Sequence, residues 1–562
     1  MRYQAPVEDL LAAMRMADGF GAGLEEADAR AVLEQAAAFA EERLLPLDAI
    51  GDRAGVRLEA GIVTTAPGWR DAYAAWRNGG WAGLSAPADG GGSGLPASLN
   101  AAVNEIWSAA NASFALGPVL TAGAVEALAR HGTAEQRALY LPKLVSGEWT
   151  GTMNLTEAQA GSDLGALRSR AEPHGDGRYR VSGAKIYITY GEHDCTDNIV
   201  HLVLARLPDA PAGSRGISLF LVPKWLPGPD GRPGERNDLV CTGLERKLGM
   251  HASPTCSMSF GDKGGATGWL VGEPHRGLHC MFTMMNNARL AVGVQGVAAA
   301  ERATQGALAY ARSRVQGRSA ASPGGPGAIV HHPDVARMLM TMQALTGAAR
   351  ALCHLTAAAI DRGEADRAAQ LTPVAKAFGT DCGIEVASLG IQVHGGMGYI
   401  EDSGAAQVWR DARIAAIYEG TNGIQAIDFV TRKLPLVDAV AGEVAAIHAA
   451  ARDARGHAGL GVVADRLEEA ALALEGVIAT LGSFSDSARL AVATPALRLF
   501  ALARGGAALA AMATVAPADA RRAALARFFA ESCLPETVAL ARVVASGATP
   551  LDGAEAALLA PQ

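Results

Sequence analysis

A cluster of short strand-like runs within an otherwise helical chain most constrains the fold. Between about residues 151 and 275 the sequence passes through AKIYIT, NIVHLVLARL, GISLFLVPKW and CSMSF, which are rich in β-branched and aromatic residues and are separated by Gly, Pro and Asp turns. Asp176-Gly177 is a hairpin signal within this region. Runs this short and this closely spaced predict a small β-barrel or β-sandwich.

The sequence on both sides of that region predicts helices. Hydrophobic residues make up 49% of the chain, much of it Ala, whereas aromatic residues make up 5%, and Ala is the strongest helix former. We expect an α+β protein that is mostly α, with several domains, because one core rarely serves 562 residues. The expected divisions are a helical domain at 1–150, the β-domain at 151–275, a helical domain at 276–435 and an additional helical domain at 436–562.

The charge and cysteine patterns argue against several classes of protein. The 49 basic and 57 acidic residues give a formal net charge of −8, which does not suggest a general attraction to nucleic acid or anionic lipid. The seven cysteines are scattered without a C-x-x-C pair, so neither a disulfide framework nor a zinc cage is expected. The N-terminus lacks the pattern of a secretory signal, and we expect no uncharged apolar run long enough to span a bilayer. A soluble protein of the reducing cytoplasm is predicted.

Two segments of the β-rich region could bind a ligand. The loop MNLTEAQAGSD (153–163) contains Gly161, Ser162 and backbone N–H groups that can hold a polar or anionic group, although Thr and Ser-Asp are also ordinary capping residues. In KIYIT, Tyr187 and Thr189 are two residues apart, so they are expected on one face of a strand, where they can cover and hydrogen-bond a planar ring. An ordinary half-buried strand is the alternative.

Two helical segments carry further candidates. Arg314 and Arg318 follow a long predicted helix and could hold phosphates in a bidentate manner, although cations near a helix C-terminus are favourable without any ligand. The glycines of GIQVHGGMGYIED (390–402) allow a ligand to approach the backbone closely. This pattern is not the G-x-G-x-x-G of a dinucleotide-binding fold, and its histidine is explained equally well by a structural role.

The most informative carboxylate is Glu419, in AAIYEGTNGIQAIDF (415–429). The preceding residues predict a helix that Asp402 or Ser403 caps and that ends at Gly420. Glu419 would then lie in the last turn and face the negative end of the helix dipole, where Lys or Arg is favoured. A solvated Glu at a frayed helix end is one explanation. The other is a general base kept in an apolar pocket, with its pKa raised by desolvation.

The order of these segments resembles the acyl-CoA dehydrogenase flavoprotein family. LTEAQAGSD resembles its T-E-P-x-x-G-S-D loop, KIYIT its K-x-W-I-T strand, and QVHGGMGY its Q-x-x-G-G-x-G-Y turn. NNARLAVGVQGVA resembles the start of its first C-terminal helix, and RDARIAAIYEGTNGIQ its R-D-x-R-x-x-x-I-Y-E-G-T segment. The motifs span about residues 20–435. ERKLGMHASPTCSMSF and the additional C-terminal domain are most similar to the 3-methylmercaptopropionyl-CoA dehydrogenase-like subgroup.

The resemblance implies a fold and a reaction. The fold is an N-terminal helical domain, a central β-domain and a C-terminal four-helix bundle, with FAD between the β-domain and the bundle and partly held by a second subunit. The reaction converts an acyl-CoA thioester to the trans-2-enoyl-CoA. Glu419 removes the α-proton, the β-hydride goes to flavin N5, and electrons pass to electron-transferring flavoprotein. The substrate is either 3-(methylthio)propanoyl-CoA or a medium- or long-chain acyl-CoA, and the protein a homodimer or higher homo-oligomer.

The resemblance also implies a set of binding residues. Those expected to contact FAD are Leu155, Thr156, Gly161, Ser162, Tyr187, Thr189, Arg314, Gln316, Gln392, Gly396, Thr421 and Gly423. Those expected to contact the acyl-CoA are Ser162, Asn286, Arg289 and Gly420, and the Glu419 backbone N–H is expected to hydrogen-bond the thioester oxygen. No metal is implied.

The chain departs from the family pattern at several of these positions. Tyr187 replaces the usual Trp, Ala158 replaces the Pro after T-E, and RVQGR lacks the Phe of R-x-x-F-G. Asn422-Gly423 stands where shorter members often have Ser-Gln. These departures leave the base in place but bear on the FAD contacts expected near Gln316 and Gly423, and Tyr187 could change the flavin potential.

Three alternatives remain open on the sequence. An acyl-CoA oxidase shares the fold and the base but reoxidises its flavin with oxygen. A DNA-binding flavoprotein of the alkylation-response type needs a basic C-terminal domain, whereas residues 436–562 contain ten Arg, no Lys and thirteen acidic residues. The third alternative is a membrane-association module in that stretch, for which DARRAALARFFAES (519–532) is the best amphipathic candidate. We expect a dehydrogenase that neither binds nucleic acid nor inserts stably into a membrane.

Overall fold

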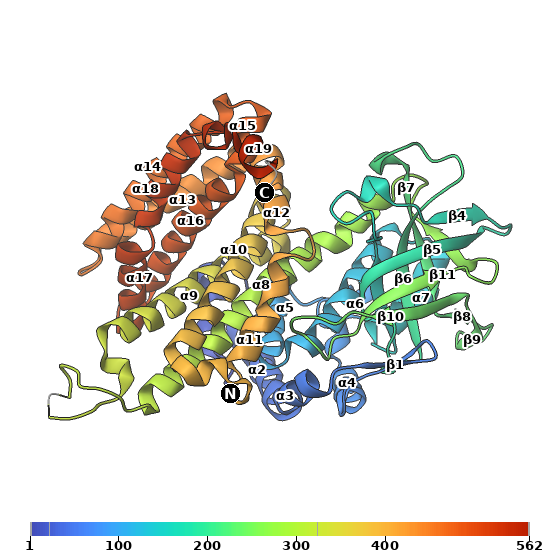
Figure 1. Cartoon of the computed structure of the whole chain (residues 1–562), viewed down its shortest axis with the longest axis horizontal. Coiled ribbons are helices and arrows are strands. Elements are labelled where there is room, and N and C mark those ends of the chain that lie inside the picture. Colours follow the sequence, from blue (N-terminus) through green and yellow to red (C-terminus); the bar gives the residue numbers. More distant parts are fainter. Residues whose placement is uncertain (1–2, 22, 323, 560–562) are drawn as a thin grey trace. The chain divides into compact units, whose positions relative to one another are not determined.

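The computed structural model describes residues 3–21, 23–322 and 324–559 (Figure 1). They form two compact units. The first contains the residues up to Glu34, the segment Pro96–Glu105 and the chain from Arg289 onward, and the second contains Gln35–Leu95 and Ile106–Ala288. The prediction of a mostly helical protein with a central β-domain is confirmed.

The chain order alternates helices, strands and helices again. The helices are α1 (Val7–Met16), α2 (Glu26–Phe39), α3 (Leu45–Ala54), α4 (Trp69–Asn78), α5 (Ala97–Ala110), α6 (Ala112–His131), α7 (Ala134–Val145), α8 (Gly277–Ser313), α9 (Pro333–Asp361), α10 (Ala365–His394), α11 (Ala405–Ala412), α12 (Asn422–Asp428), α13 (Val437–Arg455), α14 (Gly461–Ser483), α15 (Asp486–Ala491), α16 (Ala493–Val515), α17 (Ala520–Ser532), α18 (Pro535–Ala545) and α19 (Ala554–Leu559). The strands are β1 (Arg57–Glu59), β2 (Ile62–Thr64), β3 (Trp149–Asn154), β4 (Arg170–Pro173), β5 (Arg178–Thr189), β6 (Asn198–Arg206), β7 (Ile217–Pro223), β8 (Trp225–Pro227), β9 (Pro233–Arg236), β10 (Leu239–Leu244), β11 (Thr255–Phe260) and β12 (Ala266–Val271).

An eight-stranded sheet forms the centre of the second unit. The strand order is β10-β11-β5-β12-β7-β6-β3, and β4 pairs with both β5 and β6. Neighbouring strands are antiparallel, except that β3 and β4 pair with β6 in parallel. The predicted turn at Asp176-Gly177 joins β4 to β5, and both residues have the positive φ values, 50° and 70°, that this kind of tight turn requires.

Strands β6 and β7 are mostly apolar and are buried along nearly their whole length, because both of their faces pack against a core. Alternate residues of β6 contribute to two different cores: Leu202 belongs to the core shared with α6 and α7, and Val203 to the core on the other side of the sheet. On β7, Leu219 and Phe220 divide in the same way. A continuous apolar run rather than an alternating one is the pattern expected of such central strands.

Close backbone packing between α8 and α10 shapes the first unit. A Cβ atom placed on Gly293 of α8 would lie 2.7 Å from the Ala375 carbonyl oxygen of α10, and one on Gly296 would lie 2.2 Å from the Gly379 carbonyl oxygen. In the opposite direction, a Cβ on Gly383 would lie 2.6 Å from the Gly296 carbonyl oxygen. Glycine at these positions therefore lets the two helices approach more closely than any side chain would permit.

The C-terminal helices share one core with the bundle. Buried side chains of α13, α14, α16, α17 and α18 pack in the same hydrophobic cluster as those of α8, α9, α10 and α12. The rings of Phe429 and Phe500 meet edge to face with centroids 5.2 Å apart, which joins the segment after α12 to α16. Residues 436–559 thus belong to the first unit and share its core rather than being attached to it by a linker (Figure 1).

We expected no uncharged apolar run long enough to span a bilayer, but a helix can be long and apolar enough to cross a membrane while carrying one or two charged residues. Among the described residues, α6 and α16 pass that test, and the bent pair Asn422–Lys433 and Val437–Arg455 passes it only when taken together. Inside the protein, 72% of the apolar stretch of α6 and 89% of that of α16 is buried. Packing in the two cores accounts for the apolar composition of both helices.

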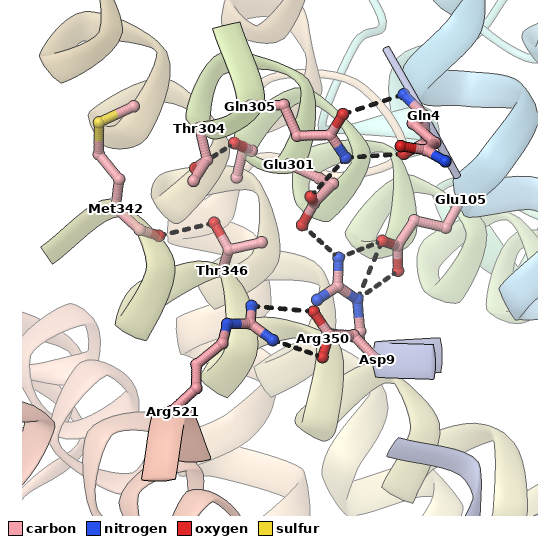
Figure 2. Close-up of polar contacts among 11 residues, drawn as sticks. Gln4, Asp9, Glu105, Glu301, Thr304, Gln305, Met342, Thr346, Arg350 and Arg521 are labelled. Atoms are coloured by element: carbon pink, nitrogen blue, oxygen red, sulfur yellow. Dashed lines mark hydrogen bonds and ion pairs between the residues drawn. The ribbon is translucent and has the colours of Figure 1, made fainter. Parts of the chain in front are cut away.

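An ion-pair network connects the N-terminal helix, the bundle and α17 (Figure 2). The buried Arg350 of α9 donates hydrogen bonds to both Glu105 of α5, at 2.6 Å, and Glu301 of α8, at 2.7 Å. Beside it, Arg521 of α17 donates two hydrogen bonds to Asp9 of α1, at 2.8 and 3.0 Å. A cavity of about 440 Å³ lies among the same helices. Since these carboxylates and guanidinium groups pair with each other, the network is well suited to hold α1 and α17 against the bundle.

Candidate active site

Glu419 lies in a turn between two helices and not at the end of one. A 3₁₀ turn at Arg413–Ala416 follows α11, and α12 begins after Thr421, whose hydroxyl accepts a hydrogen bond from the Ile424 N–H. The expectation that Glu419 closes a helix and faces the negative end of its dipole is therefore wrong. The helix tightens into the 3₁₀ turn and stops before Ile417, so the carboxylate instead precedes the start of α12, where a negative charge is not disfavoured.

The backbone of Glu419 is held in the left-handed region. Its φ is +54°, a conformation that costs a residue with a Cβ about 1–2 kcal/mol. The buried side chain of Gln425 fixes this turn, because its Nε2 donates to the carbonyl oxygens of Glu419, at 3.3 Å, and Gly420, at 3.2 Å. Gly420 has φ +83°, and a Cβ there would lie 2.7 Å from Gln425 Nε2, so this position requires glycine.

Two cations influence the carboxylate of Glu419. Burial raises the pKa of Glu419 to about 7, while Arg289 of α8 and Lys376 of α10 act in the opposite direction. Arg289 is itself 6% exposed, and its Nη1 lies 3.7 Å from the Asp428 carboxylate. The carboxyl group is therefore poised to exchange a proton near neutral pH, as a general base must. Ile417, two residues before Glu419, is 47% exposed and so does little to bury the carboxylate.

Buried polar atoms without hydrogen-bond partners lie around the same turn. The hydroxyl of Tyr418 donates to Gln295 Oε1, which leaves Gln295 Nε2 without a partner among the described residues. Gln425 Oε1 is also buried and has no hydrogen-bond partner among the described residues. Orphaned buried groups are uncommon and are characteristic of sites that are completed by a ligand. No group of three or more His, Cys, Asp or Glu side chains among the described residues could hold a metal ion.

In the second unit, a buried ion pair attaches the predicted loop to the predicted strand. Lys185 of β5 donates to Glu157, at 2.8 Å, and to the Leu155 carbonyl oxygen, at 3.0 Å. Glu157 also accepts hydrogen bonds from the backbone and hydroxyl of Ser169. Burial alone would raise the pKa of Glu157, but Lys185 and these donors bring it down to about 2. The Thr156 carbonyl oxygen accepts from the Ile186 N–H at 2.9 Å, so the loop lies directly beside the strand.

A β-bulge interrupts the strand at Tyr187. The register with β11 shifts between the pairs Ile188–Cys256 and Lys185–Met258, and Tyr187 has φ +61°. The simple alternation from which we expected Tyr187 and Thr189 to share a face is therefore broken at the first of them. The ring of Tyr187 is 60% exposed, whereas Thr189 is half-buried and its carbonyl oxygen accepts from the Thr152 hydroxyl at 2.6 Å.

This face of the second unit fits the FAD that the resemblance implies. An exposed aromatic ring held in a strained backbone conformation is a feature of binding sites more than of ordinary strands. Ser162 is exposed, and a Cβ on Gly161 would meet no atom within 4 Å, so the loop leaves room for a ligand beside its backbone. The loop and the strand together thus offer an aromatic surface, hydroxyl groups and accessible backbone N–H groups.

The residues expected to contact the adenine and pyrophosphate lie at the other end of the bundle from Glu419. Arg314 and Gln316 are exposed on the loop after α8, and the Arg314 Nη2 donates to Gln316 Oε1 at 3.3 Å. Gln392 is exposed in the last turn of α10, and Gly396 follows it. Sixteen residues of helix separate Gln392 from Lys376, which corresponds to about 24 Å. The rings of Tyr310 and His394 stack with centroids 4.6 Å apart, so the ends of α8 and α10 that precede these residues lie together, apart from the Glu419 turn.

The remaining predicted residues divide between the two units. Thr421 caps α12, Gly423 is exposed in its first turn, and Arg289 is buried on α8, all in the first unit. Asn286 is exposed on the part of α8 that belongs to the second unit.

Sequence reasoning missed several residues that hold these parts in place. Lys376, Asn422 and Gln425 surround the Glu419 turn, while Glu157 and Lys185 anchor the loop of the second unit. The sequence did contain a signal for Lys376, which is the single charged residue in the apolar helical run LTPVAKAFG. Because a buried charge almost always has a partner, a lysine in such a run predicts a paired cation in the interior. Glu157 and Lys185 stand within the quoted motifs, but their pairing depends on a contact between segments 28 residues apart.

Comparison with known proteins gives matches along most of the chain. Family models described as the acyl-CoA dehydrogenase N-terminal, middle and C-terminal domains match residues 26–148, 152–263 and 275–434. A model described as acetyl-CoA dehydrogenase C-terminal like matches residues 440–552. A 3-methylmercaptopropionyl-CoA dehydrogenase from Ruegeria pomeroyi is 51% identical over 455 residues, which cover 77% of this chain and 76% of the relative.

Two solved structures share the fold over nearly the whole chain. Caenorhabditis elegans ACDH-11 in complex with C11-CoA superposes with a TM-score of 0.80 at 21% identity and covers 98% of this chain and 95% of its own. An acyl-CoA dehydrogenase from Bacillus anthracis complexed with FAD superposes with a TM-score of 0.76 at 20% identity, covering 97% of this chain and 92% of its own. Both matches extend through the helices after residue 435, so the likeness of fold includes them.

Proposed function

Because this chain belongs to the acyl-CoA dehydrogenase family, we propose that Glu419 is the general base in the α,β-dehydrogenation of an acyl-CoA thioester. The family resemblance is confirmed, and the chain is an FAD-dependent oxidoreductase acting on CH–CH bonds. The observation that carries the assignment of the base is the turn itself: a carboxylate with a pKa near 7, on a left-handed backbone held by Gln425, beside buried polar atoms that have no partner among the described residues.

Glu419 performs the proton transfer in this proposal. Its carboxylate takes the α-proton of the thioester, and the pair of electrons left behind forms the double bond as the β-hydrogen leaves as hydride. Bound FAD supplies the acceptor for that hydride. Among the described residues no acceptor is recorded for the Glu419 backbone N–H, which supports its use as a donor to the thioester oxygen. Such a donor stabilises the negative charge that develops on the oxygen as the α-proton leaves.

We assign the predicted binding residues to FAD and substrate on the same basis. The loop and strand residues Leu155, Thr156, Gly161, Ser162, Tyr187 and Thr189 would hold the flavin. Arg314, Gln316, Gln392 and Gly396 would hold the adenine end of an FAD bound by a second subunit, which makes a homodimer the smallest complete assembly. Thr421 and Gly423 would contact the dinucleotide. Ser162, Asn286, Arg289 and Gly420 would contact the acyl-CoA. The division into domains at 150, 275 and 435 and the cytoplasmic location are part of this proposal.

The substitution Glu419→Gln tests the base. The amide is nearly isosteric but cannot accept the α-proton, so the variant should keep its yellow flavin while flavin reduction by acyl-CoA in anaerobic stopped flow slows about 1,000-fold. Glu401→Gln is the matched control, because Glu401 is an exposed carboxylate paired with Arg410 and plays no part in the proposal. Reduction of the Glu419→Gln flavin at a rate close to that of the parent protein would contradict the assignment.

The substrate and the electron acceptor need separate experiments. The Ruegeria pomeroyi relative carries the name of a 3-methylmercaptopropionyl-CoA dehydrogenase, so 3-(methylthio)propanoyl-CoA leads a panel with butyryl-, octanoyl- and palmitoyl-CoA in anaerobic flavin bleaching. We expect electrons to pass to electron-transferring flavoprotein. Hydrogen peroxide produced in equal amount to the enoyl-CoA would instead assign an oxidase.

DNA binding by the C-terminal helices finds no support in their charges. Most of their arginines are already paired: Arg498 with Glu536, Arg504 with Glu443, and Arg466 with Glu469. Electrostatic binding of a duplex needs cations that are free to meet phosphates.

A further inference from the structure

Asn422, one of the departures from the family pattern, lies at the centre of a partly buried polar cluster. Its Oδ1 accepts a hydrogen bond from Lys376 Nζ at 2.9 Å. Its Nδ2 donates to Asp381 Oδ1 at 2.7 Å and contacts Thr380 Oγ1 at 3.0 Å and the Ala377 carbonyl oxygen at 3.3 Å. All four partners belong to one stretch of α10. A single side chain at the first residue of α12 therefore binds that helix through both ends of its amide.

Lys376 is an unusual partner because its side chain is fully buried. Burial lowers the pKa of Lys376 to about 8, and Asp381 and Glu419 act in the opposite direction. A buried ammonium needs compensating acceptors and charges. Asn422 is the one hydrogen-bond acceptor recorded for it among the described residues, and the carboxylates that stabilise its charge are Asp381 on α10 and Glu419 in the turn.

The cluster is linked to Glu419 in two ways: Asn422 follows Glu419 closely in the sequence, and the charge of Lys376 lowers the pKa of Glu419. Only Gly420 and Thr421 lie between Glu419 and Asn422, and Thr421 is the cap of α12. Gln425, one turn further along α12, holds the carbonyl oxygens of Glu419 and Gly420. Any shift of the first turn of α12 relative to α10 would therefore move the left-handed turn that carries the carboxylate.

We propose that Asn422 is a positioning residue for the base: with Lys376 and Asp381 it locks the start of α12 onto α10 and so fixes where the Glu419 carboxylate lies. Arg289 on α8 and Lys376 on α10 are then the two cations placed beside that carboxylate. The close packing of α8 on α10 at Gly293 and Ala375 brings both helices to this point. This inference rests on the proposed role of Glu419.

The experiment exchanges donor and acceptor within the cluster of the full-length, FAD-loaded protein. Asn422→Ala removes all the amide contacts, and we expect flavin reduction by acyl-CoA to slow about 10- to 100-fold with little change in flavin content, since a base misplaced by about 1 Å costs that much. The double variant Asn422→Asp/Asp381→Asn lets residue 422 accept from Lys376 while residue 381 donates to it, and should recover most of the rate. Thr431→Ala is the control, because within the described part of the chain the Thr431 hydroxyl bonds to the Ile427 carbonyl oxygen alone, on the same helical segment.

A pH profile separates positioning from general loss of structure. Lys376→Met removes one of the two cations that lower the pKa of Glu419, so the acid limb of the flavin-reduction profile should move to higher pH. If this variant does not fold, the Asn422 variants still decide the question. A parental rate in Asn422→Ala, or a double variant no faster than Asn422→Ala, would overturn the proposal. If Glu419→Gln is also fully active, the assignment of the base fails instead, so the two failures are distinguishable.

Discussion

Glu419 combines a left-handed backbone with a near-neutral carboxylate, and the two features have one origin. The sharp turn at Glu419 and Gly420 lets the chain reverse from the 3₁₀ turn into α12 within a few residues. At this turn, burial of the carboxylate raises its pKa to about 7. Residues with positive φ and a Cβ persist where surrounding structure over-determines them, and here Gln425 and the Asn422 cluster supply that constraint.

The same carboxylate should make the stability of the protein depend on pH. The pKa of Glu419 is about 7 in the folded protein and 4.5 in an unfolded chain. Protonation therefore favours the folded state at low pH, and this contribution is lost as the pH rises from 4.5 to 7. Glu419→Gln cannot ionise, so its Tm relative to the parent should be similar at pH 4.5, rise across this window and then level off. Thermal unfolding of both proteins at several pH values measures it, and a constant Tm difference would show that Glu419 is not desolvated.

Among the elements, the junction of the 155–163 loop with β5 depends on one ion pair. Lys185 and Glu157 are both buried, and their hydrogen bond at 2.8 Å closes a loop whose other contacts are mostly with backbone groups. Lys185→Met should lower the stability of the second unit by about 3–5 kcal/mol, because it leaves a buried carboxylate without its cation. The loss should appear as a lower Tm together with weaker flavin retention, since the loop beside Tyr187 becomes loose.

A double variant checks that the charge is responsible. Lys185→Met/Glu157→Gln removes both charges, so it should be less destabilised than Lys185→Met alone. Acid titration offers a second readout. The pKa of Glu157 is about 2 in the folded protein and 4.5 in an unfolded chain, so its ionised form stabilises the fold above pH 4.5, and this contribution is lost as the pH falls towards 2. Lys185→Met should lose most of that dependence. Equal destabilisation in the single and double variants would mean that packing, and not charge, is what matters.

Elements were predictable from the sequence where local signals agree. They were not predictable where contacts with a neighbouring element set the boundary or the geometry. The order of helices, strands and helices and the Asp176-Gly177 turn were predictable, because periodicity, Ala content and turn residues all indicate the same structure. The end of the helix before Glu419 was not, since the 3₁₀ turn that shortens it has no sequence signal of its own. The bulge at Tyr187 was missed for a similar reason: it is defined by the register with β11.

The candidate site was predictable in its residue types but not in its supporting structure. Motif order was sufficient to select Glu419, and the structure places it in a turn with the expected near-neutral pKa. Nothing local in the sequence indicates that Asn422 bonds to Lys376 and Asp381, because that cluster exists only once α12 packs on α10. Residues that hold a functional group in place are set by tertiary contacts, and a single sequence does not reveal these.

At the scale of the whole molecule, the C-terminal helices share one core with the bundle that carries the Glu419 turn. Glu443 of α13 is 1% exposed and accepts hydrogen bonds from Arg367 of α10 and Arg504 of α16. On α16, Arg498 donates to Glu536 of α18 at 2.6 Å, and it also stabilises the ionised form of Asp381 in the Asn422 cluster. Charges of residues 436–562 thus reach the helix that anchors the Glu419 turn.

This arrangement predicts that breaking the Glu443 contacts weakens the Glu419 turn without touching it. Glu443→Gln leaves the buried Arg504 and the partly buried Arg367 without their shared counter-charge, so the Tm should fall by an amount that corresponds to about 3–5 kcal/mol. Flavin reduction should slow as well, because α10 and α12 lose support from α13 and α16. Glu468→Gln is the control, since Glu468 is a more exposed carboxylate that pairs with His448 on the same group of helices, and it should change both quantities little.

Combining Glu443→Gln with Arg504→Met removes one of the uncompensated cations and should recover part of the Tm. A Glu443→Gln protein with the Tm and flavin-reduction rate of its parent would show that the C-terminal helices are a separate attachment, and that the turn is held by the bundle alone.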